Sequence, residues 1–277
     1  MHHMNWLRAR PATAAALALI AVAGCASTSG GTNLADVPQL RPGVPAGYLA
    51  PNARPDSLAL LPQPPAADSP AFALDQDVAR QASALRGTAR WQQAETDAEL
   101  KFPQAAGAFS CALGTPVTEQ ATPHLYMLLR RTMVDAGLST YGAKNRYNRA
   151  RPFMANKTPM CTPAEEAALV TDGSYPSGHS AIGWAWALVL AEVSPERADA
   201  ILARGRAFGQ SRVVCNVHWQ SDVNEGRMVA AATVARLHAD PVFRADVARA
   251  KAELAAARAS GAGPARDCQA ESLALAQ

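Results

Sequence analysis

The sequence predicts an all-α fold on the basis of three observations. Nearly half of its 277 residues are apolar, at 49%, and only 6% are aromatic. Alanine is abundant and runs of β-branched residues are scarce, which favours helices because alanine has the highest helix propensity and β-branched residues suit strands. No internal repeat and no convincing strand is found, and the length allows one large domain or two small ones. Apolar residues also recur at helical spacing, as at Leu125, Leu128, Leu129 and Met133.

The first 24 residues have the features of a signal peptide. Arg8 and Arg10 precede a short apolar stretch at 14–23, and small residues lead to Cys25. Removing this segment takes away two arginines and no acids, so the net charge falls from +3 to about +1 (3 − 2). Such a small charge excludes a nucleic-acid binder and a polybasic membrane binder, so any affinity for anions must come from local clusters of charge.

Cys25 suggests a lipid anchor. The run Val22-Ala23-Gly24-Cys25 resembles a bacterial lipobox, which predicts cleavage before Cys25 and lipidation of that residue. Ala26 and Ser27 are similar to residues that let lipoproteins travel to the outer membrane. We therefore expect a protein of the bacterial periplasm, in contact with the outer membrane only through lipidated Cys25. Ordinary cleavage nearby would give a soluble periplasmic protein instead.

The segment after the signal peptide divides into a tether and an arm. Residues 25–46 are rich in Ser, Gly, Thr and Pro, and we expect a flexible tether. Residues 47–70 are dense in proline with scattered leucines. We expect an extended arm that lies on the domain and buries Leu58, Leu60 and Leu61.

Helices are expected to form the rest of the domain, and prolines, glycines and capping residues set their ends. The segment 180–192 is strongly apolar but too short to span a bilayer, so it is predicted to be a buried core helix. Asp240 caps the last long helix ahead of Pro241, and residues 260–277 are expected to form a frayed tail. The predicted helices cover 75–86, 95–100, 122–136 ending at Gly137, 143–151, a short segment from 163, 180–192, 195–212, 220–239 and 241–259.

Four cysteines follow Cys25, namely Cys111, Cys161, Cys215 and Cys268. An even number in an oxidising compartment suggests two disulfides, in any of three connectivities, and buried free thiols are the alternative. No Cys-x-x-Cys pair or Cys/His cluster has the spacing of a metal site, so we predict no metal.

Lys144 and Arg151 lie in the first of three stretches that could carry chemistry. They are seven residues apart, which is two helical turns, so a helix over 143–151 would project both from one face. Arginine offers a planar fork to phosphate oxygens and lysine a point charge, and Arg146 and Arg149 would add positive potential. A solvated basic face is the alternative interpretation of this spacing.

The second stretch is Pro176-Ser177-Gly178-His179, before the apolar helix. Proline suits a first helical turn and Ser177 is a good N-cap. Gly178 lets an anion approach the backbone N–H groups, and the helix N-terminus favours negative charge. His179 would then lie beside a bound anion, within reach of a leaving oxygen. A capped helix with an incidental histidine is the alternative.

The third stretch contains Ser211-Arg212, His218 and Asp222. If this segment is helical, His218 and Asp222 share a face, so Asp222 can accept from one imidazole nitrogen and aim the other. Arg212 adds a third fork for phosphate, and Asn216 suits a turn because asparagine tolerates the left-handed conformation. A surface ion pair between His218 and Asp222 is the alternative.

Together these stretches resemble a known family. Lys-x6-Arg-Pro, Pro-Ser-Gly-His and Ser-Arg-x5-His-x3-Asp form the pattern of the phosphatidic acid phosphatase type two and vanadium haloperoxidase superfamily. PDSLALLP, TPHLYMLL, GSYPSGHSAIGWAWALVL and GQSRVVCNVHWQSDV are more closely similar to the class A bacterial nonspecific acid phosphatases, over residues 47–255. The resemblance implies an all-α, single-domain helical bundle with a catalytic domain at 47–259. It also implies hydrolysis of phosphomonoesters through a phosphohistidine, without metal or cofactor.

The resemblance further assigns roles by motif position. His218 would be the nucleophile, Asp222 would orient it, and His179 would protonate the leaving oxygen and later activate water. The resemblance also implies the disulfides Cys161–Cys215 and Cys111–Cys268, homo-oligomers, and inhibition by inorganic phosphate or vanadate. The phosphoryl oxygens would be held by Lys144, Arg151, Ser177, Gly178 and Arg212.

The chain departs from the family pattern outside the motif positions. Asn216-Val217 replaces Gly-Tyr and Asn224-Glu225 replaces Asp-Ala. A lipobox is also unusual in a group whose members are commonly soluble in the periplasm. These differences bear on substrate specificity rather than on the chemistry.

The expected function is a broad-specificity periplasmic acid phosphatase, with transfer of the phosphoryl group to alcohols as a side activity. One histidine must be neutral and the other protonated, which predicts a bell-shaped pH profile on the acidic side. Three alternatives remain. A vanadate-dependent haloperoxidase would oxidise halide when loaded with vanadate, a lipid phosphate phosphatase would act at the membrane surface, and a phosphate-binding lipoprotein would show no turnover.

Overall fold

The computed structural model describes residues 30–264 and 266–277, and the signal peptide and Cys25 lie outside the described residues. The all-α prediction is confirmed. One feature departs from it, a short antiparallel hairpin of β1 (Gln39–Arg41) and β2 (Val44–Pro45) near the N-terminus. Within the described ranges, no helix is both long and apolar enough to cross a membrane.

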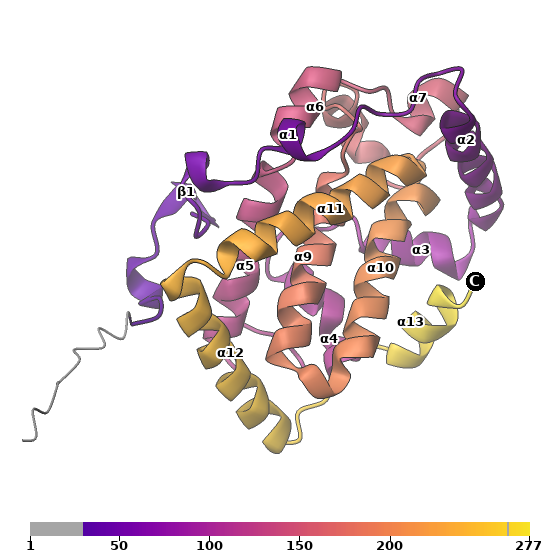
Figure 1. Ribbon diagram of the computed structural model, residues 1–277. Coiled ribbons are helices and arrows are strands. Elements are labelled where there is room, and N and C mark those ends of the chain that lie inside the picture. Colours follow the sequence, from indigo (N-terminus) through magenta and orange to yellow (C-terminus); the bar gives the residue numbers. More distant parts are fainter. Residues whose placement is uncertain (1–29, 265) are drawn as a thin grey trace, which may run out of the picture.

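The core is built around α9 (Gly178–Val193), which lies at the centre of the bundle (Figure 1). Most of its residues are buried, as predicted for the apolar segment. It packs against α5 (Pro123–Leu138), α10 (Ala198–Val214), α11 (Gln220–Leu237) and α12 (Pro241–Ala259). A helix surrounded in this way is apolar on all sides.

Two glycines let α9 and α10 approach each other closely. A Cβ atom on Gly205 would overlap the side chain of Ala187, and one on Gly183 would overlap the ring of Phe208. Alanine at either position would force the two helices apart, because a packed core has no spare volume. This close packing fixes the start of α9 relative to the end of α10, and both ends carry predicted site residues.

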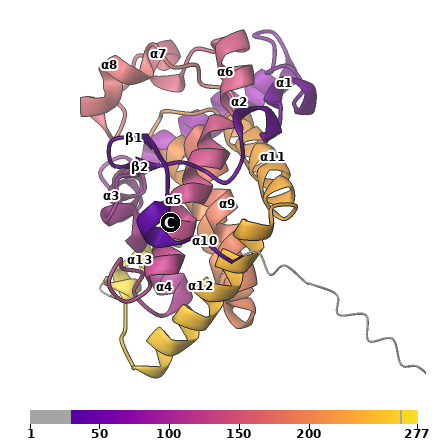
Figure 2. The same ribbon diagram turned by 90° about the vertical axis from the view of Figure 1, so that its left-hand side faces the viewer.

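Shorter helical elements surround this bundle. They are η1 (Leu34–Asp36), η2 (Pro51–Ala53), α1 (Ser57–Leu60), α2 (Pro70–Ala82), η3 (Ser83–Leu85), α3 (Ala89–Thr96), η4 (Gln104–Phe109), α4 (Ser110–Leu113), α6 (Tyr141–Tyr147), α7 (Pro152–Asn156), η5 (Pro163–Glu165), α8 (Glu166–Leu169), η6 (Pro195–Arg197) and α13 (Cys268–Leu275). Helices α6, α7 and α8 lie together at one end of the bundle (Figure 2).

Several helix boundaries differ from the predictions. The helix predicted over 75–86 begins earlier because Ser69 caps it, its hydroxyl accepting from the backbone N–H three residues later at 3.1 Å. The short helix predicted over 95–100 is shifted towards the N-terminus, since α3 begins at Ala89 and ends at Thr96. Gly137 does not end α5, which continues for one more residue. Asp240 caps α12 as predicted, accepting from two backbone N–H groups.

The flexible tether predicted for 25–46 is wrong for residues 30–46. Thr32 is buried, and its hydroxyl donates to Asp246 of α12. Arg131 of α5 donates to Thr32 Oγ1 at 2.7 Å, and the Tyr48 hydroxyl donates to Asp246 at 2.8 Å. This segment is held in place because the buried carboxylate of Asp246 needs these donors.

The predicted burial of the arm holds only in part. Leu61 is buried, but Leu58 and Leu60 remain 41% and 40% exposed. The reason is that α1 turns a polar residue inward. Ser57 is buried, and its hydroxyl accepts from the backbone N–H of Ala143 on α6 at 2.9 Å.

The frayed tail predicted for 260–277 is wrong for α13. Asp267 caps this helix, and Glu271 pairs with Arg204 of α10 at 3.3 Å. The disulfide Cys111–Cys268 fastens the start of α13 to α4, and Cys161–Cys215 forms the second disulfide. Both implied pairings are therefore confirmed.

Candidate active site

The predicted phosphate-binding side chains come from four elements. Lys144 lies on α6, Arg151 is the N-cap of α7, Ser177 is the N-cap of α9 and Arg212 lies in the last turn of α10. All four residues are at most 3% exposed. Buried cations are costly unless they hold anionic partners, so their contacts reveal what the site can bind.

Lys144 and Arg151 come together, but not from one helix as predicted. Helix α6 ends at Tyr147 because Asn148 adopts the left-handed conformation, with φ 40°. The two side chains instead converge on one oxygen. Asp172 Oδ2 accepts from Lys144 Nζ at 3.1 Å and from Arg151 Nη2 at 2.8 Å. Sequence reasoning missed Asp172, whose only signal is its position just before the second stretch.

Backbone carbonyl groups also hold Arg151. Its Nε donates to the carbonyl oxygens of Leu169 and Asp172, at 2.9 and 3.0 Å. Its Nη1 donates to the carbonyl of Val217 at 3.0 Å and lies 3.1 Å from His218 Nε2. The guanidinium is therefore fixed in position independently of any bound anion.

Lys144 is held next to the start of α9. Its Nζ donates to the carbonyl of Gly173, and a Cβ atom on Gly178 would lie 3.8 Å from its Cε. Burial lowers the pKa of Lys144 to about 8, although the charge of Asp172 opposes this effect. Lys144 therefore remains protonated under acidic conditions.

Arg212 has no hydrogen-bond partner within the described part of the chain. All three of its guanidinium nitrogens are buried and donate to no acceptor. Glu165 Oε2 forms an ion pair with it at 4.0 Å, which is too long for a hydrogen bond. Burial lowers the pKa of Arg212 to about 10. A buried arginine normally has its donors matched, so this side chain is poised to bind an anion.

The start of α9 is formed as predicted in one respect and not in another. Ser177 is the N-cap, and its hydroxyl accepts from the Ser180 N–H at 3.2 Å. Pro176 lies before the cap, not in the first helical turn. Gly178 and His179 are the first two helical residues and are half-buried. Their free N–H groups lie where a helix N-terminus attracts anions.

His179 lies at the edge of this site. Its Nε2 is 2.9 Å from the carbonyl oxygen of Ala98, and a carbonyl can only accept, so Nε2 carries a proton. Burial lowers the pKa of His179 well below its usual range, and the charges of Arg212, His218 and Arg151 add to this effect. In the free protein His179 is therefore neutral, with Nδ1 unprotonated.

His218 is buried and has a defined tautomer. It lies in the turn before α11, between the two helices predicted over 195–212 and 220–239, so His218 and Asp222 do not share a helix face. Arg151 Nη1 can only donate, so His218 Nε2 accepts and Nδ1 carries the proton. His218 Nδ1 lies 3.3 Å from Ser174 Oγ and 3.5 Å from Asp222 Oδ2. Burial, followed by the nearby cations, lowers the pKa of His218 well below its usual range.

Asp222 is held by residues to which the motifs assign no role. It accepts from the Trp219 N–H at 2.8 Å, from Arg149 Nη1 at 2.6 Å and from the Ser174 hydroxyl. Burial raises the pKa of Asp222, and Arg149 opposes this. Arg149 also pairs with Asp75 of α2 at 2.8 Å. Arg149 therefore stabilises this carboxylate. The sequence suggested instead that Arg149 would add to the positive potential of the phosphate site.

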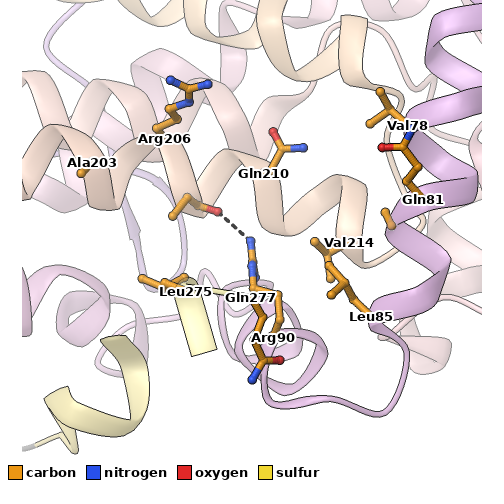
Figure 3. A pocket seen from close by; sticks show the side chains of 12 residues that line it. Val78, Gln81, Leu85, Arg90, Ala203, Arg206, Gln210, Val214, Leu275 and Gln277 are labelled. Carbon is orange, nitrogen blue, oxygen red and sulfur yellow. Dashed lines mark hydrogen bonds between the residues drawn. The ribbon is translucent and has the colours of Figure 1, made fainter. Parts of the chain in front are cut away.

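A separate pocket of about 540 Å³ lies between α2, α3, α10 and the C-terminal end of the chain (Figure 3). Val78, Arg90, Gln210 and Leu275 are among the residues that line it. Arg90 donates to Ser211 and to the carbonyl of Ala207, so two of its guanidinium nitrogens already have acceptors. None of the predicted site residues lines this pocket.

Comparisons with known proteins place the chain in a family. Residues 121–245 match the family model described as the PAP2 superfamily. A non-specific acid phosphatase of Providencia stuartii is 47% identical over 209 residues, which are 75% of this chain and 84% of that protein. An acid phosphatase of Zymomonas mobilis is 41% identical over 209 residues, covering 76% of this chain and 79% of that protein.

Among solved structures, the chain is similar to one titled as the first bacterial vanadium-dependent iodoperoxidase. The TM-score is 0.47 and the sequence identity is 19%. The match covers 73% of this chain and 60% of the iodoperoxidase chain.

Proposed function

Because this chain belongs to the non-specific acid phosphatases of the PAP2 superfamily, we propose that it cleaves phosphomonoesters by forming a phosphohistidine at His218. The observation that carries this proposal is the tautomer of His218. Its Nε2 is unprotonated, with its electron pair directed at Arg151, and its Nδ1–H faces Ser174 and Asp222. A buried, neutral and oriented imidazole is what a nitrogen nucleophile requires.

Lys144, Arg151 and Arg212 hold the phosphoryl oxygens in this proposal, together with the N–H groups at the start of α9. Phosphoryl transfer needs mainly positioning and stabilisation of charge, and three fixed cations supply both. The unpartnered donors of Arg212 support this assignment, since they offer a phosphate group several N–H contacts in a buried place.

In the first step His218 Nε2 forms a bond to phosphorus, and the bond from phosphorus to the leaving oxygen breaks. His179 gives its proton to that oxygen. In the second step water attacks phosphorus, His179 takes a proton from the water, and the N–P bond breaks. An alcohol in place of water would give phosphotransfer.

His179 needs a higher pKa for this role than it has in the free protein. Its pKa is lowered by burial and by the neighbouring cations, and a phosphate dianion between those cations offsets their charge. Substrate binding therefore raises the pKa of His179 and favours the protonated form that acts as the acid. In this proposal an acidic pH optimum belongs to the enzyme–substrate complex, so the pH profile of kcat reports it.

The two disulfides and the signal sequence support a periplasmic location, because disulfides persist in oxidising compartments. Lipidation of Cys25 would attach the protein to the outer membrane. The mass of the mature N-terminal peptide tests this, and an unmodified Cys25 would refute the anchor.

The decisive test of the mechanism is His218→Ala, assayed with a panel of phosphomonoesters at pH 5–7. We expect turnover to disappear while inorganic phosphate still binds. His238→Ala is the matched control, since His238 is 41% exposed and, among the described residues, forms an ion pair with Glu192 alone. Turnover by His218→Ala at a rate close to that of the control would refute the assignment of the nucleophile. Each assay is repeated with a chelator, and loss of activity would count against a metal-free mechanism.

A further inference from the structure

Asp172 reaches from the edge of the phosphate site to two of its cations. The side chain of Asp172 is 33% exposed, whereas those of Lys144 and Arg151 are 4% and 1% exposed. One carboxylate oxygen, Oδ2, accepts from both of them. A carboxylate oxygen and a phosphoryl oxygen are both anionic acceptors and use the same N–H donors.

The two cations do not need this carboxylate to keep their positions. Carbonyl groups of Leu169, Asp172 and Val217 accept from Arg151, and the carbonyl of Gly173 accepts from Lys144. These contacts belong to the backbone, so they persist when the Asp172 side chain is neutral. What the carboxylate adds is therefore mainly its negative charge.

We propose that Asp172 is an internal competitor for the phosphoryl group. In the free protein its carboxylate uses donors of Lys144 and Arg151 that a phosphoryl oxygen uses in the enzyme–substrate complex. Bound phosphate must displace Oδ2 or share the two cations with it. In either case the negative charge of Asp172 weakens phosphate binding and favours release of the product. This inference rests on the proposed function, which assigns both cations to phosphate.

The test compares the binding of inorganic phosphate to the full chain and its variants by calorimetry, at fixed pH and ionic strength. In Asp172→Asn we expect the dissociation constant to fall about tenfold or more, because one negative charge close to the ligand is removed. Asp172→Glu keeps the charge and should stay close to the wild type. Asp68→Asn is the control for removing a carboxylate, since Asp68 is exposed and, among the described residues, forms no ion pair.

Unchanged or weaker phosphate binding in folded Asp172→Asn would overturn the inference, because it would mean that the carboxylate positions the cations. Asp172→Ala provides a second neutral variant, and thermal unfolding checks that each variant is folded. The inhibition constant of phosphate, measured against a phosphomonoester, should fall in parallel. If the wild type neither binds phosphate nor hydrolyses phosphomonoesters, the proposed function fails. If the wild type does both and Asp172→Asn binds phosphate no more tightly, only the inference fails.

Discussion

Replacing Arg212 with methionine should stabilise the fold while it removes activity. The guanidinium of Arg212 is fully buried and its nitrogens form no hydrogen bonds within the described chain. Burial lowers its pKa to about 10 from 12.5. Lowering this pKa by about 2.5 (12.5 − 10) corresponds to a cost in folding free energy of about 3 kcal/mol, at 1.36 kcal/mol for each pH unit.

Burial of the charged Arg212 side chain lowers the free energy of unfolding. A lowered pKa means that the charged form is less stable in the folded protein, so the cost is present at every pH below about 10. Methionine keeps an apolar side chain of similar length and removes the charge. We therefore expect Arg212→Met to raise the free energy of unfolding at pH 7 by about 1–3 kcal/mol, part of the gain being lost to imperfect packing.

Arg204, on the same helix, provides the matched control. It is also buried, but it pairs with Asp97 and with Glu271. Burial lowers the pKa of Arg204, yet these carboxylates outweigh burial and raise it overall. Arg204→Met would remove the buried cation that pairs with both carboxylates and would leave Asp97 only neutral donors, from Gln93 and Ser211, which should lower the free energy of unfolding by about 3–5 kcal/mol.

Urea unfolding and steady-state kinetics measure both effects. Arg212→Met should show a higher urea midpoint than the wild type and a kcat/KM lower by about 10²–10³ or more, as for loss of a transition-state donor. Saturating phosphate should stabilise the wild type but not this variant. If Arg212→Met lowered stability as much as Arg204→Met, the argument that Arg212 is retained for anion binding would be refuted.

Two further predictions concern groups that sequence reasoning did not identify. Burial raises the pKa of Asp135 to about 6 from 3.8, so between these pH values the folded protein binds a proton that the unfolded chain does not. The free energy of unfolding of the wild type, relative to that of Asp135→Asn, should therefore rise as the pH falls from 7 to 4, by up to about 3 kcal/mol. Thermal unfolding across this pH range checks it, and a constant difference between the two proteins would contradict it. Ser174→Ala removes a donor to Asp222 and an acceptor near His218. In this variant kcat should fall about 10–100-fold with little change in KM. A change confined to KM would show that Ser174 does not position the histidine.

The features that could be predicted from the sequence are those set by neighbouring residues. Ser177 and Asp240 cap helices as predicted, because a cap depends on N–H groups two or three residues away. Asn216 adopts the left-handed conformation, with φ 62°. Lys144 and Arg151 do converge, but the predicted reason, one face of a helix over 143–151, is wrong. The helix ends between them, and the tertiary fold brings their side chains together.

The features that could not be predicted depend on distant parts of the chain. Arg149 seemed to belong to the basic stretch, but its partner Asp75 is 74 residues away on α2. No local spacing encodes such a contact. Asp172 and Ser174 lie just before the second stretch, yet only the folded arrangement shows that Ser174 faces His218 and that Asp172 faces the two cations.

The distribution of partners among the buried arginines explains why the site suits phosphomonoesters. Arg149 and Arg204 are each matched by two carboxylates, whereas Arg212, within the described residues, is matched by one distant carboxylate and forms no hydrogen bond. Of these three arginines, Arg212 therefore has the positive charge that is least offset by carboxylates, and this charge also lowers the pKa of His179. A monoester can bring two negative charges and a diester only one. In the proposed mechanism the monoester dianion would offset this positive charge more completely, so it would bind more strongly and restore more of the basicity that His179 needs as an acid. The proposed phosphate-binding cations would then couple recognition of the phosphoryl group to protonation of the leaving oxygen.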